Sequence, residues 1–198
     1  PRQAPRPASP PDTTTEKGTT VTTTDTTTST TGDEEQTYWD DISAHAITYA
    51  HLANQRVDLH AAARSAVDLH RQHGTGGLVD AAAVMLSMAS VGCPDQLRGS
   101  DGLPDSDRLT AEAHADLTSS AMRSTRTGAR RAADAGRLTG LRPAISRALA
   151  AHGPRAAAAA LREAAVDKAT VLVLLATASF VLRTVAHHAH TATQEENP

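Results

Sequence analysis

Apolar side chains recur at three- and four-residue steps from Tyr38 onward, and this spacing predicts α-helices. The first apolar stripe consists of Trp39, Ile42, Ala46, Tyr49 and Ala53. Residues 38–73 contain no proline or glycine, although Asp58 is placed to cap a second helix after a break at residues 54–58. The pattern therefore predicts one or two helices before Gly74.

Glycine and proline mark the ends of the next helices. Residues 74–77 contain three glycines and are expected to end the helix before them. A largely apolar helix is predicted at residues 78–91, and Gly92-Cys93-Pro94 stops it. The polar segment that leads from there to Asp107 is longer than most loops of compact domains, so we expect it to be functional or mobile.

Three further helices are predicted in the second half of the chain. Asp107 is placed as the N-cap of the first, which runs to about Ala135. Pro143 suits the first turn of a short second helix that ends near Gly153. Pro154 starts the last helix in the same way, and this helix extends to about residue 190.

The last of these helices contains the most apolar run of the chain. Residues 169–182 are apolar on all sides of the predicted helix, between Lys168 and Arg183. The run has 14 residues, fewer than the roughly 20 that cross a bilayer. We therefore expect a long, buried C-terminal helix and no membrane span.

The first 36 residues lack the apolar groups that a core requires. Prolines are frequent at the start, and residues 13–31 are mostly threonine without the alternating apolar partners that give a strand a face to bury. We therefore expect a disordered Pro/Thr-rich tail at residues 1–36, either a simple linker or a site of hydroxyl modification. One helical domain is expected at residues 37–198, frayed after about residue 190.

The predicted fold class is all-α, a bundle of about five to six helices with the long C-terminal helix at its centre. Aromatic residues make up only 2% of the chain, so Ala, Leu and Val must fill the core. Alanine favours helices, but small side chains bury little area each. Because such a core gains from burial against another chain, we expect a homo-oligomer or a protein partner.

The formal net charge of -3 hides an uneven distribution of charge along the chain. Nine arginines and one acid, Asp134, lie between Arg123 and Arg162, whereas 17 acids and eight bases precede Arg123. The arginines are either neutralised within the fold by these acids or presented to an acidic protein partner or to nucleic acid. The candidate contact residues lie opposite an apolar helix stripe and are Arg123, Arg126, Arg130 and Arg131.

No cluster in the sequence has the spacing of a catalytic or metal site. The grouped histidines, namely His70 and His73 and then His187, His188 and His190, belong to no HExxH pattern and have no cysteine partners. Four acids fit positions of a calcium-binding loop that lacks its central glycine: Asp101, Asp105, Asp107 and Glu112. We therefore predict no catalytic residues, no metal ligands and no cofactor.

These observations favour a non-enzymatic function. The single Cys93 gives no disulfide framework, and no signal peptide is visible, so we expect a soluble, cytoplasmic protein. The preferred interpretation is a helical interaction or scaffold protein that associates with itself. The alternative is a nucleic-acid-associated regulatory protein that uses the Arg-rich helix face.

Overall fold

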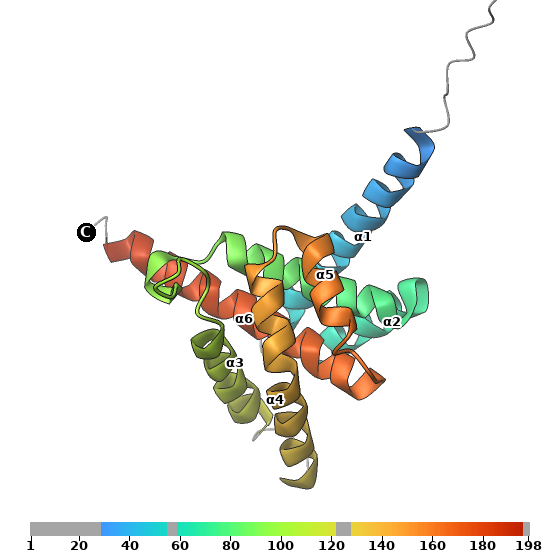
Figure 1. Cartoon of the computed structure of the whole chain (residues 1–198). Helices are drawn as coiled ribbons and strands as arrows, with labels where there is room; N and C mark the ends of the chain where they lie inside the picture. The colour runs from blue at the N-terminus through green and yellow to red at the C-terminus, as the bar shows by residue number, and fades with distance from the viewer. Residues whose placement is uncertain (1–28, 55–58, 122–127, 196–198) are drawn as a thin grey trace, which may run out of the picture.

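The computed structural model describes residues 29–54, 59–121 and 128–195 as an arrangement of helices (Figure 1). The helices are α1 (Ser29–Asn54), α2 (Leu59–Val91), the 3-10 helix η1 (Asp95–Leu97), α3 (Ser106–Ala121), α4 (Gly128–Ala150), α5 (Pro154–Arg162) and α6 (Lys168–Glu195). The described residues form no β-strand and only one isolated bridge, between Arg98 and Pro104. The predicted all-α class and the predicted number of helices are confirmed.

The long helices α2 and α6 form the centre of the bundle. α6 contacts α1, α2, α3 and α4, and α2 also contacts α5. The buried face of α6 consists of Val171, Leu174, Leu175, Ala178, Val181 and Val185. The prediction of a long, buried C-terminal helix is confirmed, although one side of α6 reaches the surface, where Leu172 is 44% exposed.

Two of these helices are long and apolar enough to cross a membrane by length and composition, at residues 60–91 and 168–194. The bundle buries 67% of the most apolar window of the first and 50% of that of the second. Because the core helix of a soluble protein passes the same test, this finding is weak evidence for a membrane span.

The core is built from small side chains, as the composition predicts. Alanine is the most frequent residue among the buried apolar residues of the described chain. The largest fully buried side chains are Leu, Ile and Met rather than aromatic residues. Helices lined by alanine approach each other closely, but each such contact removes little apolar surface from water.

α1 begins earlier than the sequence predicts. It starts at Ser29, within the segment expected to be disordered, whereas order was predicted from Thr37 onward. The carboxylates at residues 33–35 lie in the second turn of the helix, and its first turn carries no acidic side chain. The hydroxyl of Thr37 donates to the carbonyl of Asp33 at 2.8 Å. The remainder of the predicted tail, residues 1–28, lies outside the described residues.

α4 runs unbroken through a predicted helix boundary. The sequence places the end of one helix near Ala135 and the start of another at Pro143, but Pro143 lies inside α4. Pro143 and Thr139 are both exposed, so water can reach the Thr139 carbonyl that loses its helical donor. On the opposite face, burial continues through Leu138, Leu141, Ala144, Ile145 and Ala148. This continuous packing offsets the cost of a helical proline, which is about 3 kcal/mol.

The last predicted helix is divided into α5 and α6. α5 ends at Arg162, and Asp167 caps the start of α6. Oδ1 of Asp167 accepts the backbone N–H of Thr170 at 2.8 Å, and Oδ2 accepts the Thr170 hydroxyl at 3.0 Å. These bonds from Thr170 lower the pKa of Asp167 below its ordinary value. The cap is visible in the sequence, but the apolar residues on both sides of it favoured one continuous helix.

The polar segment between α2 and α3 is held by hydrogen bonds to its backbone. The Arg98 guanidinium donates to the carbonyl of Cys93 at 3.1 Å. The thiol of Cys93 is buried, and burial raises its pKa. Oδ1 of Asp105 accepts the N–H of Arg108 at 3.0 Å, so the acceptor at the start of α3 is Asp105 rather than the predicted Asp107.

Candidate functional site

α1 and α2 pack against each other as a helical hairpin, and polar side chains cross between them. Tyr38 of α1 reaches Asp80 of α2, and His45 of α1 reaches Gln72 of α2. α2 therefore runs back along α1, and residues about 30 positions apart in sequence become neighbours. This hairpin carries the strongest candidate site.

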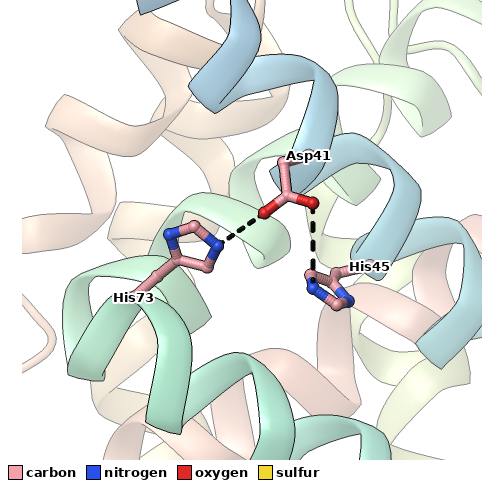
Figure 2. Close-up of side chains that lie close together, drawn as sticks. All are labelled: Asp41, His45 and His73. Carbon is pink, nitrogen blue, oxygen red and sulfur yellow. Dashed lines mark hydrogen bonds and ion pairs between the residues drawn. The ribbon is translucent and has the colours of Figure 1, made fainter.

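Asp41, His45 and His73 converge between the two helices (Figure 2). Oδ2 of Asp41 is 2.6 Å from Nε2 of His73, and Oδ1 of Asp41 is 4.0 Å from Nε2 of His45. The three potential ligand atoms all lie within 4.8 Å of one another. Among the described residues, no other group of three Asp, Glu, His or Cys side chains meets this condition.

Neighbouring side chains orient the two imidazole rings. Nε2 of His45 is 2.8 Å from Oε1 of Gln72, and the ring of His73 packs edge-on against Tyr38 with centroids 5.4 Å apart. The His45 and His73 side chains are 24% and 18% exposed, whereas Asp41 is 48% exposed. The rings are therefore partly fixed by packing, and the carboxylate faces solvent.

Two glycines of α2 allow His73 to lie where it does. Gly74 has a φ of 67° and a ψ of -163°, and it kinks the helix directly after His73. A Cβ at position 77 would lie 2.3 Å from the Cβ of His73, so only glycine fits at Gly77 without a shift of the backbone. Gly74 has no helical conformation, so the predicted helix end at residues 74–77 is confirmed, and α2 consists of two helices joined at this kink.

A buried carboxylate lies beside this cluster and joins three helices. The Asp80 side chain is 3% exposed, and its two oxygens accept hydrogen bonds from the Tyr38 hydroxyl at 2.6 Å and from the Arg162 guanidinium at 2.8 Å. Burial, with the hydrogen bond and charge of Asp80, raises the pKa of Tyr38 to about 12. The ring of Tyr38 in turn contacts His73. Asp80, with which Arg162 pairs, therefore fixes the tyrosine that packs against the cluster.

The other histidine group singled out in the sequence lies on α6, far along the chain from this hairpin. Nε2 of His188 is 3.5 Å from Oε2 of Glu112, and the ring centroids of His187 and His188 are 5.9 Å apart. These residues and Arg183 line a cleft of about 400 Å³ between α3 and α6. They form no three-ligand group among the described residues.

The acids of the calcium-like pattern serve local structure. Oδ1 of Asp101 accepts the N–H of Leu103 at 3.0 Å, as in an ordinary turn. Glu112 accepts from the guanidinium of Arg108 at 3.1 Å. Within the described residues these acids do not converge on one point.

The predicted Arg-rich contact is only partly visible. Arg123 and Arg126 lie outside the described residues, and Arg130 and Arg131 lie at the start of α4, where only the backbone is described. The prediction for these four residues stays a prediction. Two later arginines of α5 do meet acids of the first helices: Arg162 contacts Asp80, and Arg155 contacts Glu35 at 3.2 Å.

The first turns of α1 form a second feature that the sequence did not predict. They extend beyond the other helices, at the opposite end of the molecule from the start of α4 (Figure 1). Residues 32–37 of this projecting end are all exposed and include Asp33, Glu34 and Glu35. Asp33 and Glu34 form no ion pair with any described residue.

Comparison with known proteins gives no relative for this chain. No protein-family model matches it, and neither the curated proteins nor the solved structures contain a match.

Proposed function

We propose that this chain is a non-enzymatic helical interaction protein that associates with itself through opposite charges. In this proposal the acidic end of α1 in one copy, residues 32–37, binds the Arg-rich segment of a second copy, which includes Arg123, Arg126, Arg130 and Arg131. The observation that supports the proposal is the position of the acidic start of α1 and of the start of α4 at opposite ends of the fold (Figure 1).

The separation of the two ends favours contact between copies. An ion pair requires the charged groups to come within about 4 Å, and exposed charges more than a Debye length apart interact little, about 10 Å at 0.1 M salt. The fold holds the start of α4 away from the projecting end of α1 (Figure 1). An ion pair between the start of α4 and the projecting end of α1 therefore requires a second molecule.

The small-residue core supports the same conclusion. A bundle whose buried residues are mostly alanine and leucine gains stability when more surface is covered. The exposed turns of α1 gain most, because a helical segment held by few tertiary contacts, here the ion pair of Glu35 with Arg155, is only marginally stable in water. A partner that binds these turns would stabilise their helical conformation.

Sedimentation velocity of the full chain at low micromolar concentration tests this function. We expect a dimer or larger species at about 0.05 M salt and a shift towards monomer at about 1 M salt, where the screening length falls to about 3 Å. The variant D33N/E34Q/E35Q should be monomeric at both salt concentrations. A stable wild-type monomer at low salt would contradict the proposal.

A matched variant controls for net charge. D68N/D107N/E163Q removes the same number of charges from exposed acids outside the projecting end. It should associate like the wild type, and an equal loss of association would show that net charge rather than the α1 end is responsible. Binding of random duplex DNA by monomeric protein at low salt, with no self-association, would favour the nucleic-acid alternative instead.

A further inference from the structure

We propose that Asp41, His45 and His73 bind one divalent transition-metal ion of the zinc class at the surface of the α1–α2 hairpin. The proposal is independent of self-association and adds a ligand site to the chain. It rests on the convergence of the three side chains in Figure 2.

The donor set selects the class of metal. Two imidazole nitrogens and one carboxylate oxygen suit zinc and its neighbours, whereas calcium and magnesium require mostly oxygen ligands. Two histidines with one carboxylate are also a known set for zinc sites in which the fourth position holds water. The solvent-facing side of Asp41, which is 48% exposed, leaves room for that water.

The distances between the donor atoms are close to those of a bound state. Ligand atoms at about 2.0–2.2 Å from a tetrahedral metal lie roughly 3.3–3.5 Å from one another. In the structure Asp41 is 2.6 Å from Nε2 of His73 and 4.0 Å from Nε2 of His45, and no pair of donor atoms exceeds 4.8 Å. To reach the metal geometry these atoms must move by about 1 Å, and the hydrogen bond between Asp41 and His73 must give way to the metal.

The surrounding residues restrict the side-chain conformations of the three ligands before any metal binds. Asp41 and His45 are four residues apart on α1 and therefore share one helix face. His73 is held by the kink at Gly74 and by its contact with Tyr38, which Asp80 fixes in turn. A set held in this way loses less side-chain entropy on binding than three exposed residues do.

Gln72 competes with the metal for His45. Its Oε1 lies 2.8 Å from Nε2 of His45, the atom that would coordinate the ion. Metal binding must break this contact, after which the Gln72 amide lies beside the site. Removal of the amide should therefore not abolish binding, which distinguishes Gln72 from the three ligands.

Isothermal titration of untagged, metal-stripped full-length protein with zinc tests the site. The titration is made at about 1 M salt, where charge-driven association is screened, so that the outcome does not depend on the proposed function. We expect saturable one-to-one binding that an excess of magnesium does not displace. Each of D41N, H45Q and H73Q should weaken it by at least about 10-fold, whereas Q72A should retain binding.

His60 and the α6 histidines supply the controls. H60Q removes an exposed histidine of the same helix as His73 and should bind zinc like the wild type. H187Q/H188Q/H190Q should also bind normally, and loss of binding in this variant alone would overturn the site. Circular dichroism of each metal-free variant establishes that it is folded, and cobalt absorption typical of tetrahedral coordination should be lost in H45Q and H73Q. No saturable binding by the wild type, or equal weakening by H60Q and H73Q, would also overturn the proposal.

Discussion

Asp80 shows how much one buried charge depends on its partners. Its carboxylate is nearly inaccessible to solvent, whereas its ion-pair partner Arg162 is 57% exposed. The other pair on the same helix, Arg155 with Glu35, is exposed on both sides, at 56% and 51%. α5 therefore carries one ion pair of each kind, and the two can be compared directly.

Substitution of these two arginines should have unequal effects on stability. R162A leaves the buried carboxylate with only the Tyr38 hydroxyl as a partner, and we expect it to lower the free energy of unfolding by about 1–3 kcal/mol. R155A removes a surface pair and should cost less than about 1 kcal/mol. Urea unfolding of both variants measures the difference, and equal losses would contradict the role assigned to Asp80.

At the scale of the element, the kink in α2 decides which residues face α1. The helix turns at Gly74, whose positive φ is strained for a residue with a Cβ, although a Cβ there would meet no atom within 4 Å. Gly76 also has open space around it but no positive φ. Alanine would clash with no atom at either position, so a difference in stability between the two substitutions measures the cost of the conformation at Gly74.

Alanine substitutions at these glycines should act in opposite directions. G74A should destabilise the fold by about 1–3 kcal/mol, because the backbone conformation of Gly74 is one that essentially only glycine adopts. G76A should be neutral or stabilise the fold by up to about 1 kcal/mol, because alanine restricts the unfolded chain and favours helix. Thermal unfolding followed by circular dichroism compares them, and a neutral G74A would argue against a kink that is essential to the hairpin.

The ends of helices could be predicted from the sequence where no neighbouring pattern opposed the local signal. Gly92-Cys93-Pro94 ends α2 as expected, because glycine and proline both oppose helix there. The prediction that a helix starts at Pro143 was wrong because this proline is exposed on the surface of α4. The local sequence does not show which face of a helix a proline lies on. Asp167 was overlooked because the apolar residues around it extended the helical pattern across its cap.

The candidate metal site could be predicted only in part. Asp41 and His45 have visible helical spacing, but His73 joins them through the register of two packed helices. The sequence paired His73 with His70 instead, since these residues are one turn apart on the same helix. Spacing within one segment cannot show which residues of another segment lie opposite, and the predicted absence of metal ligands depended on such local spacing.

At the scale of the whole molecule, part of the acidic charge lies at the start of α1, and the start of α4 lies at the opposite end of the fold. Some of the basic charge is neutralised within the fold, as at Arg155 and Arg162. The acidic start of α1 and the Arg-rich start of α4 remain apart (Figure 1). Head-to-tail contacts between these ends would be heterologous, so they form rings if the rotation between copies closes and filaments if it does not.

Complementary charge reversal tests this self-association most directly. One variant carries D33K/E34K/E35K, and a second carries R123E/R126E/R130E/R131E. In each variant alone both ends have the same sign of charge, so we predict monomers at about 0.05 M salt in sedimentation velocity. An equimolar mixture restores opposite charges at both contacts and should form mixed dimers or larger species. If the mixture stays monomeric, or if either variant still associates alone, the two ends do not bind each other and the proposed function is wrong.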